Sequence, residues 1–234
     1  MEIMGKNLKI ITILLITIIG FYLVFLYIDL YKSQFNYVST NLKFISIISC
    51  FIISLLTNGR TFDSVNLRLL QWGLFLTVIA DFFLLKMERY NEIGVLIFSL
   101  VQIIYSVRYD VKNRNKIIRD FLIIFLVLNG INFVFVRARF IYVIALFYGI
   151  GLISNLVKAV NIYIHGLYPK INGLMVALGM FLFLLCDINV ALYNILKYMN
   201  KTDGIIYSIS SISIWLYYLP SQVLLSLSGY KFKE

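Results

Sequence analysis

The sequence predicts an all-α membrane protein, a polytopic bundle of eight transmembrane helices that forms a single domain over residues 1–234. Of the 234 residues, 61% are hydrophobic and only 14% are charged, whereas a soluble domain carries about 25% charged residues. The apolar residues also form long runs separated by short charged loops, which is typical of helices that cross a bilayer. The strands of a membrane barrel would alternate in polarity, and these runs do not.

Eight apolar runs define the predicted spans. The first follows two lysines and lacks both the short apolar core and the small-residue cleavage site of a signal peptide, so we expect it to remain as a membrane helix. The second, fourth and fifth are short for a hydrocarbon core that takes about 20 residues to cross, so their ends can shift by several residues. The spans are Leu8–Tyr27, Leu42–Leu56, Leu69–Leu85, Ile93–Val107, Phe121–Phe135, Phe140–Leu156, Ile171–Leu192 and Ile205–Leu227.

The distribution of Lys and Arg predicts the orientation of these spans. With a cytoplasmic N-terminus, 13 basic residues fall on the cytoplasmic side and 8 on the other, and the loop Arg108–Asp120 contributes most of the difference. We therefore expect an integral protein of a bacterial plasma membrane with both termini in the cytoplasm. In each half of the chain, a helix with an aspartate precedes a charged turn, a glycine and a more polar helix. This pattern suggests a 4+4 parallel repeat.

The net charge of +10 does not indicate a nucleic-acid partner, because the basic residues lie in loops between apolar helices. They fit topology signals and contacts with anionic membrane lipids better. Cys50 and Cys186 fall within helices and are predicted to be buried apolar residues rather than a disulfide. The single histidine, His165, cannot build a multi-histidine zinc site. We expect neither a metal nor a cofactor.

Two aspartates, Asp81 and Asp187, lie inside membrane-length apolar runs. A carboxylate at the middle of a membrane helix costs about 2.5–3.5 kcal/mol on insertion scales, and such residues are usually functional. One interpretation is a catalytic or ion-binding pair of carboxyl groups in a common pocket. The other is structural, in which the aspartates bond to Ser, Asn or Tyr across helices, or form an ion pair with Lys43.

Other polar residues accompany this pair. Lys43, at the start of the second span, is expected at the same depth as both aspartates, where it snorkels to the interface or offers a cation to a lipid phosphate or to one of the acids. Gln102 lies in the middle of the fourth span, where interhelical hydrogen bonding is its expected role, and Asn189 lies close to Asp187. The last span begins with an unusually polar stretch over residues 207–213.

Four short motifs follow one another along the spans: Lys43-Phe44, Ala80-Asp81, Gln102 three residues before Tyr105, and Cys186-Asp187. From about Lys43 to Ser228, their order resembles the YhhN family of membrane proteins, whose characterised members include lysoplasmalogenases. At these places the family has Lys-Pro, Gly-Asp, a His or Gln before the Tyr, and Ser-Asp. The acids and the lysine therefore match, while their neighbours differ.

The resemblance implies hydrolysis of the vinyl-ether bond of a lysoplasmalogen, a lysophospholipid, to a fatty aldehyde and a glycerophosphoalcohol. It implies Asp81 and Asp187 as the catalytic pair, and the expected substrate-binding residues are Lys43, Gln102, Tyr105 and Asn189. Vinyl-ether hydrolysis begins with proton transfer to carbon and passes through an oxocarbenium ion. A protonated carboxyl can supply that proton, and an ionised one can stabilise the cation. The residues alone leave open a small proton- or cation-coupled transporter, or a non-catalytic lipid-binding protein.

Overall fold

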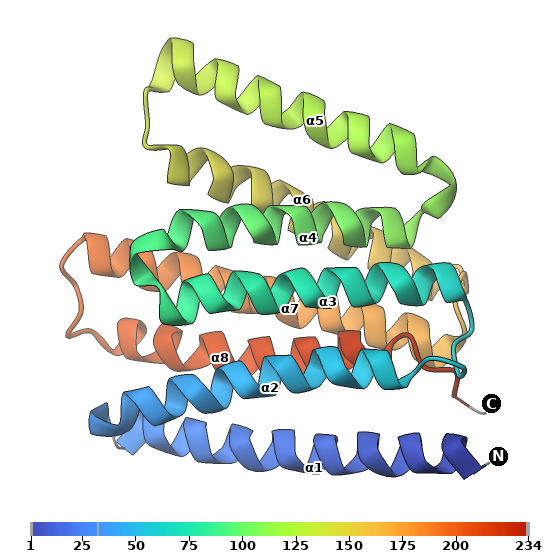
Figure 1. Cartoon of the computed structure of the whole chain (residues 1–234). Coiled ribbons are helices and arrows are strands. Elements are labelled where there is room, and N and C mark those ends of the chain that lie inside the picture. Colours follow the sequence, from blue (N-terminus) through green and yellow to red (C-terminus); the bar gives the residue numbers. More distant parts are fainter. Residues whose placement is uncertain (1, 32, 233–234) are drawn as a thin grey trace.

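The computed structural model describes residues 2–31 and 33–232, without the side chains of residues 2–6, 33 and 88. Lys6, Lys32 and Lys233, three of the basic residues behind the predicted orientation, lie outside the described side chains. In the described part, the chain folds into eight α-helices (Figure 1): α1 (Glu2–Tyr31), α2 (Asn36–Leu56), α3 (Ser64–Lys86), α4 (Asn91–Tyr109), α5 (Arg114–Ile131), α6 (Phe140–Ile164), α7 (Lys170–Tyr198) and α8 (Ile205–Leu227).

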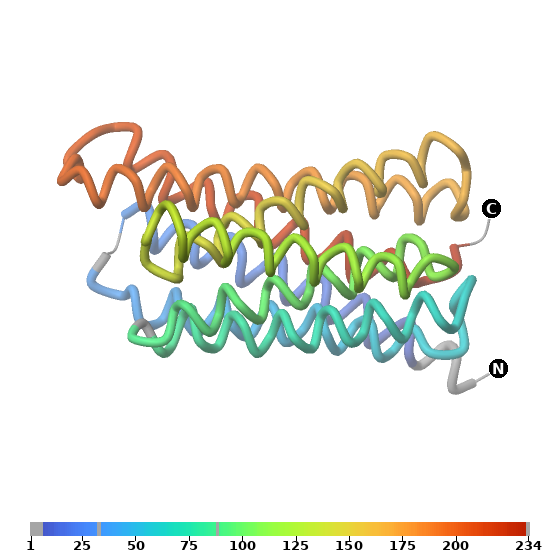
Figure 2. Tube along the Cα trace, turned by 90° about the horizontal axis from the view of Figure 1, so that it is seen from above, coloured from blue at the N-terminus to red at the C-terminus, as the bar shows by residue number. Residues whose placement is uncertain are grey.

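The helices run alternately in opposite directions along one bundle. The start of α1 and the end of α8 lie at the same end (Figure 1), and the view from above shows the same alternation (Figure 2). Each predicted span corresponds to a helix, and the three short ones are longer than predicted. The α2 and α4 helices have 21 and 19 residues, and the π-helical turn Asn132–Val136 continues α5.

Among the described residues, seven helices, α1 to α7, contain segments long and apolar enough to cross a membrane. The α8 helix has 23 residues but a more polar composition, and it packs against α7, α2 and α1 inside the bundle. The all-helical membrane fold is thus confirmed, while the eighth span stays a prediction. The 4+4 repeat also stays a prediction.

The bundle places polar side chains inside and large apolar side chains outside. Gln102 and Asn155 are fully buried, whereas Ile16 and Leu126 are 65% and 61% exposed. This distribution suits a protein surrounded by hydrocarbon, where polar groups find partners only within the protein. We therefore expect a functional site among the buried polar side chains of the bundle.

Glycines set the close approach of the two helix pairs that include the aspartates. A Cβ atom at Gly73 of α3 would lie 2.3 Å from the Tyr105 ring of α4. A Cβ atom at Gly179 of α7 would lie 2.9 Å from Leu225 of α8. Small residues at such interfaces let neighbouring helices approach closely. The α3–α4 and α7–α8 pairs are therefore tightly packed, and they hold Asp81 and Asp187 at fixed positions.

Candidate functional site

Helical periodicity directs both aspartates toward the interior. On α3, the buried residues Leu70, Leu74 and Thr77 precede Asp81 at spacings of three or four. On α7, Val176, Met180 and Phe183 lead in the same way to position 187. Residues at these spacings share one face of a helix. The spacing that buries the apolar residues therefore also turns both carboxyl groups away from the surrounding lipid.

Asp81 is held by a tyrosine from a helix distant in the sequence. Its side chain is almost completely buried, with 4% of its surface exposed. The hydroxyl group of Tyr218, on α8, donates a hydrogen bond of 2.6 Å to Asp81 Oδ2. This bond joins α3 to α8 and supplies the carboxyl group with a polar partner inside the bundle.

Asp187 is held in a similar way from α6. The hydroxyl group of Tyr148 donates a hydrogen bond to Asp187 Oδ2. Unlike Asp81, Asp187 is only partly buried. Both aspartates therefore form the hydrogen bond to a Tyr across helices that the structural interpretation expects. Such bonds are compatible with a catalytic role as well, because they also fix the orientation of each carboxyl group.

An aromatic layer connects the two Asp–Tyr pairs. The ring of Phe98, on α4, lies 6.0 Å from the Tyr148 ring and 6.4 Å from the Tyr218 ring. The Phe183 ring lies 5.6 Å from Tyr218 and 6.0 Å from Phe98. The fold therefore brings together two acids that are separated by about a hundred residues, with buried phenylalanine rings between their tyrosine partners.

Lys43 forms an ion pair with a third acid that the sequence analysis did not select. Its Nζ lies 2.7 Å from Asp29 Oδ2 on α1, and no described ion pair joins it to Asp81 or Asp187. The predicted ion pair with one of those aspartates is therefore wrong. The physical reason is that α1 extends to Tyr31, beyond its apolar run, and so carries Asp29 alongside the start of α2.

Lys43 nevertheless belongs to the same group of side chains. Its ammonium group lies 5.2 Å from the centre of the Trp215 ring, and that ring lies 5.2 Å from the Tyr218 ring. Tyr218 in turn binds Asp81. One continuous set of contacts therefore runs from Lys43 through α8 to Asp81, and through Phe98 to Asp187.

Gln102 and Tyr105 lie deeper along α4 and make packing contacts. Asn155 on α6 donates a hydrogen bond of 2.8 Å to Gln102 Oε1, which confirms the predicted interhelical role. Tyr105 is fully buried against Gly73. Asn189 donates a hydrogen bond of 2.8 Å to the carbonyl oxygen of Leu185 on its own helix. Their predicted contacts with substrate stay predictions, and these contacts place none of the three against the aspartates.

Several residues of the site were missed in the sequence. Tyr148 follows Phe147 in the apolar run of the sixth predicted span, in which the sequence analysis selected no residue. Tyr218 lies in Trp215-Leu-Tyr-Tyr218, downstream of the polar stretch that was noted. A hydroxyl-bearing aromatic residue in the middle of a span was the available signal, because a buried tyrosine usually needs a hydrogen-bond partner.

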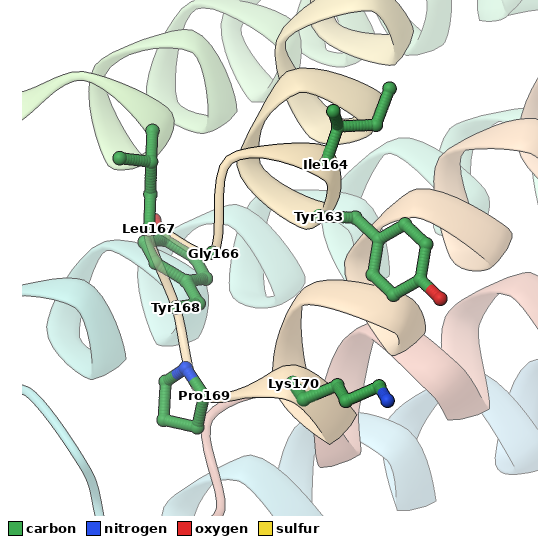
Figure 3. Close-up of a pocket in the computed structure, with 7 residues that line it drawn as sticks. All are labelled: Tyr163, Ile164, Gly166, Leu167, Tyr168, Pro169 and Lys170. Atoms are coloured by element: carbon green, nitrogen blue, oxygen red, sulfur yellow. The ribbon is translucent and has the colours of Figure 1, made fainter.

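A hollow of about 710 Å³ lies far from the aspartates, where α6 ends and α7 begins (Figure 3). Its lining includes Tyr163, Tyr168 and Lys170. Burial raises the pKa of Tyr168, against the opposing effect of the Arg108 guanidinium, so the Tyr168 hydroxyl keeps its proton and donates a 2.8 Å bond to the carbonyl oxygen of Arg108. Asp187 lies roughly 25 Å further along α7 by the helical rise. This hollow is therefore separate from the acidic pair.

No part of the described chain gathers three or more His, Cys, Asp or Glu side chains into a metal-binding group. Cys50 and Cys186 are both buried and free, as predicted. The polar groups that the described contacts bring together at the site are carboxyl, phenol and ammonium groups, next to aromatic rings.

Comparison with curated proteins finds no match, and comparison with solved structures finds none either. The model of the YhhN family matches residues 38–229. That range begins at the start of α2 and reaches the end of α8, so it contains Lys43, Asp81, Asp187 and both tyrosine partners. The chain belongs to the YhhN family.

Proposed function

We propose that this protein is a membrane-embedded hydrolase that cleaves the vinyl-ether bond of lysoplasmalogens, releasing a fatty aldehyde and a glycerophosphoalcohol. The observation that carries the proposal is the pair of tyrosine-bound aspartates on either side of one aromatic layer within membrane-length helices. A single-chain lipid in the bilayer would present its vinyl ether at the depth of such a pair. The resemblance to lysoplasmalogenases supplies the reaction.

The first step uses one carboxyl group as an acid. It transfers its proton to the double-bond carbon that is not bonded to the ether oxygen. The π electron pair of the double bond forms the new C–H bond. Positive charge then develops on the carbon bound to oxygen, and the second carboxylate stabilises this oxocarbenium ion. Asp81 is the proposed proton donor because it is the more deeply buried of the two, and burial without a paired cation favours the neutral form of a carboxyl group.

The second step uses the other carboxylate as a base. It takes a proton from water while the water oxygen bonds to the cationic carbon, which produces a hemiacetal. The hemiacetal then breaks its bond to the glycerol oxygen, which takes the proton held by that base, while the hemiacetal hydroxyl returns a proton to the first carboxyl group; a fatty aldehyde remains and both acids regain their starting states. Asp187 is the proposed base because it is partly exposed. Tyr148 holds it in position through a hydrogen bond.

The aromatic layer has a defined place in this proposal. Phe98 and Phe183 exclude water from the acids and offer an apolar surface to the hydrocarbon next to the vinyl group. Because their rings lie between the two tyrosines, the substrate must displace at least one ring to reach both carboxyl groups. Exclusion of bulk water protects a reactive cation from side reactions.

The test is mass spectrometry of the products that the purified protein forms from a lysoplasmalogen. Wild-type protein should release fatty aldehyde, whereas Asp81→Asn and Asp187→Asn should each lose at least a hundredfold in turnover, because acid–base groups contribute about 10²–10⁴-fold. Asp203→Asn, in the exposed turn before α8, is the matched control and should retain full activity. A lysolipid with a saturated ether, which cannot be protonated in this way, should remain intact.

Two results would refute the proposal. Full activity in either aspartate variant would remove that residue from the mechanism. Proton flux into liposomes that depends on both aspartates, with no aldehyde from any lysoplasmalogen, would identify the protein as a transporter instead.

A further inference from the structure

In the described part of the chain, six helices form a closed ring around the polar interior of the bundle. Each packs against the next in the order α2, α3, α4, α6, α7 and α8, and α8 packs against α2 to close the ring. The α1 and α5 helices lie outside the ring, at opposite edges of the bundle (Figure 1). Both acids and both of their tyrosine partners belong to ring helices. The interior of the ring is therefore shared by the acids and by other buried side chains of these helices.

Nine buried polar atoms of the ring helices have no hydrogen-bond partner among the described residues. They belong to residues of α4, α6, α7 and α8, and in the described part of the chain α1 and α5 contribute none. Buried polar groups in proteins are almost always satisfied, either by neighbouring groups or by ordered water. Unpartnered groups that are confined to one enclosed interior therefore point to water bound there.

On α4, the unpartnered groups recur at helical spacing. They are Gln102 Nε2, the Tyr105 hydroxyl and, one turn further, Arg108 Nη1 and the Tyr109 hydroxyl. Three or four residues correspond to a rise of about 4.5–6 Å along a helix. A water molecule that forms a hydrogen bond on each side joins polar groups about 5.5 Å apart. Successive groups along α4 are thus spaced as single water molecules would bridge them.

The α8 helix brings a group of the same kind next to the acids. Gln222 is fully buried, and neither atom of its amide has a partner among the described residues. It lies one helical turn, about 6 Å, from Tyr218, which binds Asp81. At the other end of the set, Asn172 bonds to the carbonyl oxygen of Ser228, about 15 Å beyond Tyr218 along the chain of α8. The unpartnered groups therefore extend from the acids to the end of α8.

These groups lie on one side of the acids only. Gln102 follows Phe98 on α4, Asn155 follows Tyr148 on α6, and all three helices α4, α6 and α8 run in the same direction (Figure 1). Among the residues that the structure describes, none of the unpartnered atoms lies beyond the acids toward the start of α8. Water in this interior would therefore enter at the end of the bundle where α8 ends.

We propose that the ring holds a file of ordered water molecules that leads from the end of α8 to the acid pair, and that Gln222 binds the molecule nearest to the acids. This inference rests on the proposed function for what the water does. It deepens that function by assigning the source of the water that Asp187 activates. A substrate that displaces a ring of the aromatic layer also opens the acids to this water file, so that an ordered water molecule reaches the cation while bulk water does not.

Water inside the ring can be detected in the purified protein without any substrate. Hydroxyl radicals generated from bound water by a short X-ray pulse label the side chains beside it, and mass spectrometry of peptides locates the label. After correction for the intrinsic reactivity of each residue type, Tyr105 and Tyr109 should be labelled on the order of tenfold more than Phe25 and Phe121, because only the tyrosines lie next to bound water. The pairs match in exposure, 0% for Tyr105 and Phe25 and 7% for Tyr109 and Phe121. Equal labelling within these pairs would overturn the inference.

Gln222→Met tests the connection to the chemistry, because it keeps the length of the side chain and removes both amide atoms. Turnover of a lysoplasmalogen should fall roughly tenfold, the effect of one lost hydrogen bond to the attacking water. In D₂O, the unreacted lipid should also gain deuterium. A cation that no water attacks loses H⁺ from the carbon that received D⁺, and the double bond forms again. Gln71→Met is the matched control, because the amide of Gln71 is satisfied by the carbonyl oxygen of Ser54, and it should behave like wild type.

Ser221→Ala provides a second change in the water file if Gln222→Met does not fold. Ser221 is fully buried, and its Oγ also has no partner among the described residues. This variant should gain deuterium in the same way, with a smaller loss of turnover. Wild-type turnover without deuterium uptake in either variant would overturn the role of the water file. Labelled tyrosines in a protein that releases no aldehyde would remove the proposed function and leave the water file in place, whereas aldehyde release without labelled tyrosines would do the reverse.

Discussion

Tyr218 donates a hydrogen bond of 2.6 Å to Asp81, and this bond joins α8, a helix rich in serine and tyrosine, to an acid that is only 4% exposed. Neither partner suits hydrocarbon alone. The α8 helix falls below the apolarity expected of a membrane span, and an isolated carboxyl group in a bilayer is costly. The Tyr218 hydroxyl gives the Asp81 carboxyl group a hydrogen-bond donor, and the carboxyl group gives Tyr218 an acceptor. The bond therefore stabilises α8 inside the bundle and orients Asp81.

We expect Tyr218→Phe to separate the stability of the bundle from its chemistry. The change leaves Asp81 buried without its hydrogen-bond donor, at a cost of about 1–3 kcal/mol in unfolding free energy. It should also lower kcat for vinyl-ether hydrolysis by roughly tenfold, less than the loss of the acid itself, because the carboxyl group remains but is no longer oriented. Thermal unfolding in detergent and aldehyde release measure the two effects.

The neighbouring Tyr217 provides the control for this experiment. It is partly exposed and packs at the edge of the core, without a hydrogen bond to either aspartate. Tyr217→Phe should change neither the melting temperature nor the turnover appreciably. If both phenylalanine variants behave alike, the bond to Asp81 has no special role.

The positions of the helices and of both aspartates could be predicted from the sequence because each depends on local pattern. Apolar runs mark the helices, and an acid within a run is visible without any knowledge of its neighbours. The partners of these acids could not be predicted, because Tyr218 lies 137 positions from Asp81 along the chain. Helix pairing at that separation is decided by packing, which a single sequence does not display.

The error over Lys43 has a similar cause. The possible ion pair of Lys43 with Asp81 or Asp187 was inferred only from their shared depth in the membrane, yet several other residues lie at that depth. Asp29 is nearer because α1 continues past its apolar run and packs against α2. Predicting this pair would have required the register of two neighbouring helices. Depth in a membrane thus narrows the possible partners of a charge without selecting one.

A second prediction concerns Tyr105, which we interpret as a packing residue of the α3–α4 pair. Gly73→Ala would place a methyl group 2.3 Å from the Tyr105 ring, which is fully buried. We expect a loss of about 1–3 kcal/mol in stability, as overpacked cores show. Thermal unfolding of the purified protein in detergent measures it.

The compensating change makes this test specific. Tyr105→Leu shortens the side chain that the new methyl group meets, so the double variant should be more stable than Gly73→Ala alone. Gly20→Ala, at a helical glycine with no neighbouring atom within 4 Å, is the control and should stabilise α1 slightly. Activity in the double variant close to that of wild type would also show that Tyr105 does not bind the substrate, whereas its loss there with an intact fold would support the original prediction.

The opposite end of the bundle contains a buried arginine with neutral partners. Arg108 is 1% exposed. Its Nε donates a 3.0 Å hydrogen bond to Asn66 Oδ1, and its Nη2 donates a 2.8 Å bond to Ser228 Oγ. No carboxylate pairs with it among the described residues. The guanidinium therefore joins α4 to α3 and to the end of α8 through amide and hydroxyl oxygens alone.

This arrangement predicts that removing a partner of Arg108 is more harmful than removing Arg108 itself. Asn66→Ala leaves a buried positive charge short of an acceptor and should cost about 3 kcal/mol or more, since unpaired buried charges are the costliest groups to leave unsatisfied. Arg108→Met removes the charge and leaves neutral groups, one of which, Ser228 Oγ, still donates to Leu225, so its cost should be smaller. In the Arg108→Met background, Asn66→Ala should then lose most of its effect, a coupling within the range of about 0.5–3 kcal/mol seen for residues in direct contact. A double-mutant cycle of unfolding in detergent measures this coupling, and equal costs of Asn66→Ala in both backgrounds would show that the bond to Arg108 does not stabilise the bundle.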